Sequence, residues 1–283
     1  LLPTYGERLG LKGKCCTHWA LNPHPTMIPA IEADMVEHIY SFGGEPGMED
    51  YVKARPDIFA VGPDGEMRGG RANAHIAGLY GIDLFIGATL QVDKYGNSST
   101  AIKGRIAGFG GAPNLGGTPP GRRHRTETFT KSGVVREGVH YGRKLVVQIT
   151  PTVAAKKGIP VFVDELYAQT LYKEGLFDAP PIMISGDQLT HIVTEQGVAY
   201  LDKCPDLETR MQAVAAVAGD TPVGRTADEI IVSRLKSAGI VRTPEDLGVD
   251  PKQANRSLLA AQTLDDLVSI SGGIYHIPEG FKG

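Results

Sequence analysis

Cysteine is scarce in this chain, and no stretch of apolar residues is long. The three cysteines, Cys15, Cys16 and Cys204, do not make a disulfide framework, because adjacent cysteines almost never bridge each other and one thiol is left over. The longest apolar stretches, 82–90 and 145–149, fall far short of the roughly 20 residues that span a bilayer. These absences argue against a disulfide-stabilised secreted domain and a membrane-spanning protein, and they favour a reducing, cytoplasmic compartment.

An excess of positive charge is also missing. The 29 lysines and arginines are outnumbered by 32 acidic residues, so the net charge is -3 and no general positive field exists to hold a nucleic-acid backbone. We therefore expect no nucleic acid as the main partner. Glycine and proline are plentiful instead, with 36 and 19 residues among 283, which predicts many tight turns and loops lined by backbone.

Short apolar segments alternate with amphipathic segments along the chain, and no repeat is found. This pattern predicts the α/β class, with an open, mostly parallel sheet covered by helices. Strands are expected at 83–92, 144–149 and 191–194, a hairpin turn at 94–97 and a helix at 207–218. From residue 228 onward the pattern is helical, so the expected domains are a main domain, 1–227, and a small helical tail packed on it, 228–283.

Several catalytic signatures are absent. The chain has no GxSxG elbow, no Walker loop and no GxGxxG segment that would open a nucleotide-binding helix. His18 and His24 lie six residues apart in a loop, without the further cysteine or acidic ligands that a zinc ion needs, so no metal is expected.

Five glycines lie in the ten residues 108–117, including Gly110 and Gly111. Such a segment leaves backbone N–H groups uncovered by side chains, where a carbonyl or carboxylate oxygen can be hydrogen-bonded. An ordinary flexible loop between strands is the alternative interpretation.

A basic run follows at 121–125, with Arg122, Arg123 and Arg125. Arginine suits phosphates and carboxylates, so the run is a candidate to bind a phosphopantetheine phosphate, a coenzyme A pyrophosphate or the acidic face of a carrier protein. A solvated loop remains the other interpretation.

Two further segments carry candidate residues. The stretch 18–26 holds His18, Asn22 and His24 between prolines, which fits either a loop that hydrogen-bonds a carboxylate or a structural loop. Glu195 directly follows an apolar strand and precedes Gln196 and Gly197. Open α/β sheets bind ligands at the ends of their strands. An acidic residue in the first turn of a helix, where the helix dipole stabilises it, explains Glu195 equally well.

The chain resembles the α subunit of bacterial malonate decarboxylase, the malonate:acyl-carrier-protein transferase. The resemblance is carried by 2–14 (LPTYGERLGLKGK), 18–26 (HWALNPHPT), 83–91 (DLFIGATLQ), 104–114 (GRIAGFGGAPN) and 121–124 (GRRH), and it covers essentially the whole chain. More distantly, it resembles the coenzyme A transferases and the citrate lyase α subunit, with Gly110 and Gly111 matching an acyl-binding glycine pair. It implies a coenzyme A transferase-like fold. The start at Leu1 predicts a cut within a longer protein, of which this is the C-terminal half.

The resemblance also implies an activity and a site. The activity is exchange of acetate for malonate on the thioester of an acyl carrier protein, whose phosphopantetheine arm is a co-substrate, with no permanently bound cofactor. The partners implied are the carrier, the other decarboxylase subunits, malonate and acetate. The residues implied to be catalytic are Glu195, Gly110 and Gly111, and those that bind substrate are His18, Asn22, His24, Gly87, Ala112 and Asn114.

Two positions depart from the transferase pattern. Ala20 and Gly87 stand where the coenzyme A transferases carry an acyl-accepting glutamate and an asparagine. Malonate itself is then the expected nucleophile, while Glu195 either orients a histidine or accepts the acyl group. Two alternatives to carrier exchange stay open: coenzyme A transfer between small carboxylic acids, and a carrier-docking fragment that is inactive without the other half of the protein.

Overall fold

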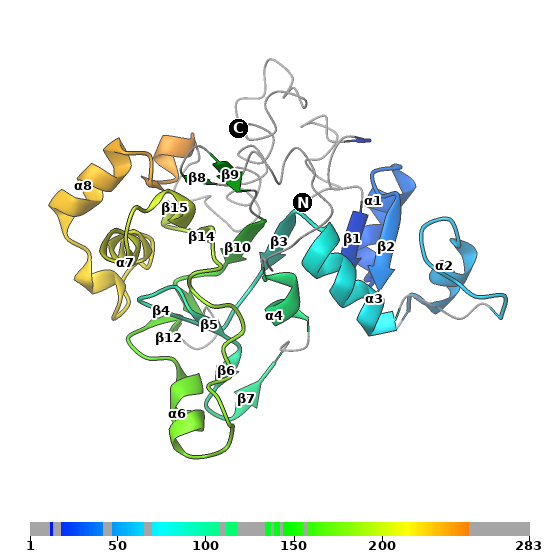
Figure 1. Ribbon diagram of the computed structural model, residues 1–283, viewed down its shortest axis with the longest axis horizontal. Coiled ribbons are helices and arrows are strands. Elements are labelled where there is room, and N and C mark those ends of the chain that lie inside the picture. Colours follow the sequence, from blue (N-terminus) through cyan, green and yellow to red (C-terminus); the bar gives the residue numbers. More distant parts are fainter. Residues whose placement is uncertain are drawn as a thin grey trace. The chain divides into compact units, whose positions relative to one another are not determined.

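The computed structural model describes residues 12–13, 18–41, 47–64, 70–107, 111–117, 134–136, 139–141, 144–154 and 158–248. The described residues divide into two compact units (Figure 1). Unit 1 contains those up to Asp83 and those from 134 to 144, and unit 2 contains those of 84–117 and 145–248. The boundary expected between residues 227 and 228 falls inside unit 2, and 249–283 lie outside the described residues.

Unit 1 is built around a pair of parallel strands. Its elements are β1 (His18–Leu21), η2 (Pro25–Met27), α1 (Ile28–Glu32), β2 (His38–Ser41), α2 (Glu49–Ala54), α3 (Gly70–Ile76), η3 (Ala77–Gly81), β8 (Val134–Arg136) and β9 (Val139–Tyr141). Ile39 of β2 is fixed by both its backbone and its side chain. Its N–H donates to the carbonyl of Ile58 at 3.0 Å, and its side chain is buried, as are those of Ile31 and Phe59. β2 therefore has one buried face and one half-buried face, and no residue of β1 is fully buried.

Unit 2 contains a five-stranded sheet in the order β16-β15-β14-β10-β3. β3 (Leu84–Gly87), β10 (Leu145–Ile149) and β14 (His191–Thr194) run parallel, and β15 (Gly197–Tyr200) and β16 (Val241–Arg242) extend the sheet antiparallel. The α/β class with a mostly parallel central sheet is confirmed. The strand expected at 144–149 is confirmed at 145–149, and the strand expected at 191–194 is confirmed with the same bounds.

The central strand β10 is buried along its whole length, as its nearly continuous apolar sequence predicts. Val146 packs into a cluster with Phe162, Ile192 and Val214 on one face of the sheet. Val147 and Ile149 pack on the other face with a second cluster of β14 and β15 residues. Burial of each such side chain contributes about 1.5–3 kcal/mol, so the sheet is the stable centre of unit 2.

The strand expected at 83–92 is divided. β3 ends at Gly87, and β4 (Gln91–Asp93) belongs to another sheet, between β5 (Ser98–Ser99) and β13 (Phe162–Val163). The division has a physical cause at Thr89, whose hydroxyl donates to the backbone carbonyl of Ser99 at 2.9 Å and turns the chain out of the first sheet. The hairpin is confirmed: its turn is held by the Asp93 carboxylate, which accepts hydrogen bonds from the backbone N–H groups of Tyr95 and Asn97 at 2.9 Å each.

The remaining elements of unit 2 are short. They are β6 (Ala101–Ile102), β7 (Arg105–Ile106), α4 (Ala112–Leu115), β11 (Val153–Ala154), β12 (Ile159–Pro160), α6 (Tyr167–Lys173), η4 (Leu201–Lys203), α7 (Leu207–Ala216), η5 (Gly224–Thr226), α8 (Glu229–Ser237) and η6 (Glu245–Leu247).

Two capped helices, α7 and α8, lie beside the sheet (Figure 1). Asp206 accepts a hydrogen bond from the N–H of Thr209 at 2.7 Å and Asp228 from that of Ile231 at 3.0 Å, which satisfies N–H groups at each helix start. The helix expected at 207–218 is confirmed at 207–216. The described part of the tail holds not only helix but also β16, the edge strand of the sheet. None of the helices described here has the length and apolar character to span a membrane.

Candidate functional site

The carboxyl ends of three parallel strands gather polar residues at one edge of the sheet in unit 2. Thr89 follows β3, Thr150 and Thr152 follow β10, and Thr194 and Glu195 end β14. All four threonines are buried. Because β3, β10 and β14 run parallel, their carboxyl ends meet at the same edge, where ligands of open α/β sheets bind.

Glu195 is anchored by a single residue of the neighbouring strand end. The backbone N–H of Thr152 donates to both carboxylate oxygens at 3.1 Å, and the Thr152 hydroxyl donates to Oε1. Charge-assisted hydrogen bonds of this kind are stronger than neutral ones, so they join the exits of β10 and β14. Glu195 does not lie at the start of a helix, which was the other interpretation of its position, because the strand β15 follows it.

Hydrogen bonds extend this edge to β3. The Thr150 N–H donates to the carbonyl of Val193 at 3.0 Å, and the Thr150 hydroxyl donates to the carbonyl of Thr89 at 3.3 Å. The three strand exits are thus fixed to one another by side chains as well as by the sheet.

The loop after α7 packs against this edge of the sheet, at Thr194 and Thr152. The Thr194 hydroxyl donates to the carbonyl of Val217 at 2.7 Å. Gly219, with φ of +61°, lies so close that a Cβ there would be 3.1 Å from the Thr152 side chain. The loop therefore supports the residue that holds Glu195.

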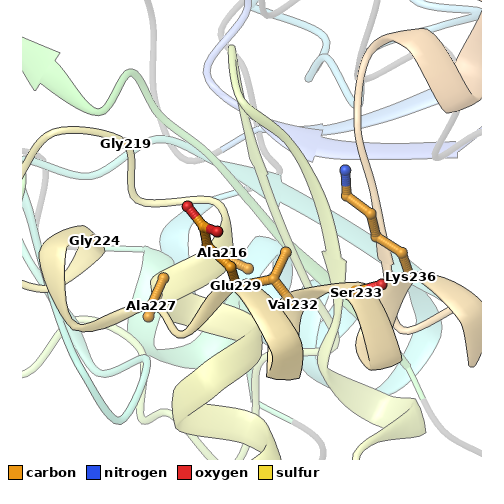
Figure 2. A pocket seen from close by; sticks show the side chains of 9 residues that line it. Ala216, Gly219, Gly224, Ala227, Glu229, Val232, Ser233 and Lys236 are labelled. Carbon is orange, nitrogen blue, oxygen red and sulfur yellow. The ribbon is translucent and has the colours of Figure 1, made fainter.

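Gly219 of the same loop also lines a surface pocket of about 390 Å³ (Figure 2). It lies between α7, η5 and α8, and it is lined by Ala215, Ala216, Gly219, Gly224, Ala227, Glu229, Val232, Ser233 and Lys236. Figure 2 shows Glu229 and Lys236 extending from α8 on either side of Val232 and Ser233. None of the residues singled out in the sequence lines this pocket.

The glycine-rich segment is described from Gly111 onward, and there it forms the short helix α4 rather than an open loop. The N–H groups of Asn114 and Leu115 donate to the carbonyl of Gly111 at 3.1 and 3.0 Å, and those of Gly116 and Gly117 also bond within the segment. The expectation of uncovered backbone is wrong at these four positions, because Pro113 in the first turn starts a helix that uses their N–H groups. The N–H groups of Gly111 and Ala112, at its start, have no acceptor within the helix.

Gly87 of the candidate set and Gly116 of the glycine-rich segment serve close packing. Gly87 is the last residue of β3, where a Cβ would lie 2.7 Å from the ring of Phe85. In the glycine-rich segment, a Cβ at Gly116 would overlap the side chain of Ile184. Ala112 packs against the main hydrophobic cluster of unit 2, and Asn114 is exposed.

The histidine-containing stretch lies in unit 1. His18 begins β1, and Asn22 follows the end of that strand. His24 caps η2: its Nδ1 accepts a hydrogen bond from the Thr26 N–H at 3.2 Å, so part of its function is structural. The rings beside His18 are those of His38 and Tyr40, each with its centroid 6.4 Å away.

Four of the candidate residues, Gly110, Arg122, Arg123 and Arg125, lie outside the described residues. Within the described part of the chain, no group of three or more histidine, cysteine or acidic side chains is arranged to hold a metal ion.

Cys204 is the free thiol of unit 2, and it is not an activated nucleophile. Burial raises its pKa to about 11, and the nearby carboxylates of Asp202 and Asp206 add to the rise, although the charge of Arg210 opposes it. The thiol therefore stays protonated at neutral pH. Burial likewise raises the pKa of Asp93, although its hydrogen bonds to Asn97 and to the turn backbone oppose the change.

Sequence reasoning singled out Glu195 but not Thr152, which holds it, nor Thr89 and Thr150 at the same strand edge. A signal was present, since a threonine closely follows the apolar run of each parallel strand. His38 and Tyr40 were also missed as neighbours of His18, because they become neighbours only through the pairing of β1 with β2.

Comparisons with known proteins point to one family over the whole chain. The family model described as "Malonate decarboxylase, alpha subunit, transporter" matches residues 1–283. A curated protein of Malonomonas rubra, named acetyl-S-ACP:malonate ACP transferase, is 56% identical over 288 residues, which are 99% of this chain and 52% of that protein.

Two solved structures are similar as well. The malonate decarboxylase α subunit from Acinetobacter baumannii is 51% identical, with a TM-score of 0.83 over 98% of this chain and 52% of that one. A chain of a Pseudomonas malonate decarboxylase hetero-tetramer in complex with malonate is 49% identical, with a TM-score of 0.81 over 100% of this chain and 52% of that one. The chain thus spans about half the length of the relatives it matches.

Proposed function

The chain belongs to the malonate decarboxylase α-subunit family, and from this membership we propose that it exchanges acetate for malonate on the thioester of an acyl carrier protein. One observation carries the proposal: the Malonomonas rubra relative, 56% identical over nearly the whole chain, is named for that reaction. The carrier, the other decarboxylase subunits, malonate and acetate are the partners that we propose, in the cytoplasm.

The reaction needs positioning more than acid–base chemistry. A carboxylate oxygen of malonate attacks the acetyl thioester, and the carrier thiolate leaves, which gives a mixed malonyl-acetyl anhydride. The thiolate then attacks the malonyl carbonyl of the anhydride, and acetate leaves. The energies of the two thioesters are similar, so the protein must mainly hold the two acids and the thioester in register.

We assign the oxyanions of the two tetrahedral intermediates to Gly110, Gly111 and Ala112. The support is the start of α4, where the N–H groups of Gly111 and Ala112 have no acceptor within the helix. Loss of one such donor typically lowers a rate by on the order of 10²–10³. Gly87 and Asn114 are assigned to substrate binding on the family resemblance alone.

The free acid and the carrier are assigned to separate groups. His18, Asn22 and His24 bind the malonate carboxylate that does not react, because imidazole and amide N–H groups donate to carboxylates. Arg122, Arg123 and Arg125 bind the phosphopantetheine phosphate or the acidic carrier surface, as the planar arginine fork suits both.

Glu195 is assigned a positioning role. Its oxygens already accept hydrogen bonds from Thr152, which supports a carboxylate that holds the strand exits rather than one that carries an acyl group. We expect Glu195→Gln to keep more than about a tenth of the exchange rate, because one oxygen can still accept from the Thr152 N–H. A covalent role requires a loss on the order of 10³-fold or more in the same assay.

The test of the function is isotope exchange. Labelled malonate is incubated with the chain and an acetyl-carrier, and the labelled malonyl-carrier is separated and counted. Label in the carrier is the expected result. The same assay with acetyl coenzyme A in place of the carrier examines the alternative of coenzyme A transfer. If the chain exchanges with neither thioester, it does not perform the reaction alone and the proposal is overturned for this chain.

A further inference from the structure

Four residues of β1 and β2 share one face. The strands pair parallel, with His18 opposite His38 and Ala20 opposite Tyr40. Side chains alternate between the two faces of a strand, so these four point to the same side, and Trp19, Leu21, Ile39 and Ser41 point to the other. Ile39 and Ser41 are each 1% exposed, whereas His38 and Tyr40 are half-buried and the side chain of His18 is 47% exposed. On β2 the ring-bearing face is thus the more accessible one, whereas on β1 Trp19 and Leu21 of the opposite face are half-buried too.

The three rings on this face are close neighbours. The centroids of His38 and Tyr40 are 4.6 Å apart in an edge-to-face arrangement, and each lies 6.4 Å from that of His18. Ala20 adds only a methyl group. We call His18, His38 and Tyr40 the ring cluster.

The ring cluster is rich in hydrogen-bond donors. Imidazoles offer N–H groups and the phenol offers an O–H group, all of which suit a carboxylate. In the parts of unit 1 that are described, no hydrogen bond of the His38 ring or of the Tyr40 hydroxyl is found. An acid lies beside the cluster, since Oε2 of Glu37 is 4.0 Å from Nδ1 of His18.

The electrostatics of the cluster also favour an added anion. The pKa of His38 lies below its ordinary value, because burial disfavours the charged imidazolium and because His18 is close. A carboxylate among the rings would offset both effects by supplying the opposite charge.

We propose that the ring cluster binds the free dicarboxylic acid through the one of its two carboxylates that does not react. His38 and Tyr40 then join His18 as binding residues. This inference rests on the proposed function and adds two residues to its site. It also explains how product leaves: acetate lacks a second carboxylate, so the cluster retains the dicarboxylic acid and releases the monocarboxylic one.

The experiment measures binding of malonate alone to the 283-residue chain, without carrier or thioester. Isothermal titration gives the affinity, and ¹H–¹⁵N spectra of the histidine ring nitrogens report the place of binding. Malonate is expected to shift the ring signals of His18 and His38 and to bind at least about tenfold more tightly than acetate, because a charge-assisted hydrogen bond is lost with the second carboxylate.

Two conservative variants test the added residues. His38→Gln and Tyr40→Phe are each expected to weaken malonate binding by about tenfold and to leave acetate binding nearly unchanged. Tyr95→Phe, which removes the same hydroxyl from an exposed tyrosine in the hairpin turn of unit 2, is the matched control and is expected to bind malonate like the unchanged chain. Near-ultraviolet circular dichroism checks that each variant is folded.

Several results overturn the inference: no binding of malonate, ring signals of both histidines that do not respond to it, or folded variants that bind it like the unchanged chain. The ring spectra decide the matter even if a variant does not fold. Failure of the proposed function is a separate result, because a chain that binds malonate through these rings but shows no exchange supports the inference and contradicts the function.

Discussion

Glu195 is a partly buried carboxylate whose two oxygens accept hydrogen bonds from one residue, Thr152. The sequence marks Glu195 as an acid after a strand, but nothing in the sequence says that its partner lies 43 residues earlier. Only the parallel pairing of β10 with β14 brings the two together. The chemistry of this residue therefore depends on the sheet as much as on its own charge.

Removal of the Glu195 carboxylate is expected to destabilise the fold. In Glu195→Ala the buried N–H of Thr152 loses its acceptor, which costs about 1–3 kcal/mol. The free energy of unfolding from urea titration measures the loss. Glu165→Ala is the matched control: Glu165 pairs with Lys173 at 2.6 Å, but both side chains are more than half exposed, so the change should stay within about 0.5 kcal/mol. Equal losses in the two variants would contradict the role given to Thr152.

Cys204 is expected to react slowly. With its pKa raised to about 11 by burial, its alkylation by iodoacetamide at pH 8 should be slower than in the urea-unfolded chain by on the order of a hundredfold. The rate should rise until about pH 11, as followed by mass spectrometry of the Cys204 peptide. Because the folded pKa lies above the unfolded one, the stability that the neutral thiol contributes is present below the unfolded pKa and is lost as the pH rises through about 11. An alkylation rate that levels off near pH 8.5 would show that the pKa of the Cys204 thiol is not raised by burial.

Among the elements, the long apolar strand and the capped helix were the easiest to predict from sequence. β10 is apolar at four of its five positions, and α7 is preceded by Asp206, a residue type that favours the start of a helix. The division of 83–92 into β3 and β4 was not predictable, because the cause is a hydrogen bond from Thr89 to the distant Ser99. Nor was α4, since five glycines in ten residues oppose a helix and only Pro113 favours its start.

The turn between β14 and β15 depends on Gly197, which has φ of +140°. A methyl group there would overlap the backbone carbonyl of Arg242 in β16, so Gly197→Ala combines backbone strain with a clash. We expect a loss of about 3 kcal/mol or more in the free energy of unfolding.

Gly239→Ala is the control for this turn. Gly239 has φ of +66° with open space around its Cβ position, so only the left-handed conformation is penalised, by about 1–2 kcal/mol. Urea titration of both variants makes the comparison. A smaller loss in Gly197→Ala than in Gly239→Ala would mean that β16 does not pack as described.

At the scale of the whole molecule, the sequence indicated the α/β class and the family, because both depend on long patterns of residues. The placement of site residues was less predictable. Thr89, Thr150 and Thr152 contribute to the same strand edge as Glu195, but they become neighbours only when three separate strands align. The ring cluster likewise depends on the register of β1 with β2.

The basic run is expected to govern recognition of the carrier. Changing Arg122, Arg123 and Arg125 together to alanine should raise KM for the acyl-carrier by at least about tenfold and weaken its dependence on salt, with little change in kcat. The matched control changes three exposed basic residues of unit 2, Lys103, Arg105 and Arg234, to alanine. Steady-state exchange at two ionic strengths makes the comparison, and equal effects in both triple variants would show that the position of the basic run is unimportant.

The order of strands in the sheet has a consequence for synthesis of the chain. The backbone of Val146 in β10 is bonded to Thr190, 44 residues later. At about 5–20 residues per second, the ribosome needs roughly 2–9 s to supply that partner. During this interval a strand that is apolar at four of its five positions has no neighbour on its β14 side, so 145–149 is the segment that molecular chaperones should protect while the protein is being made.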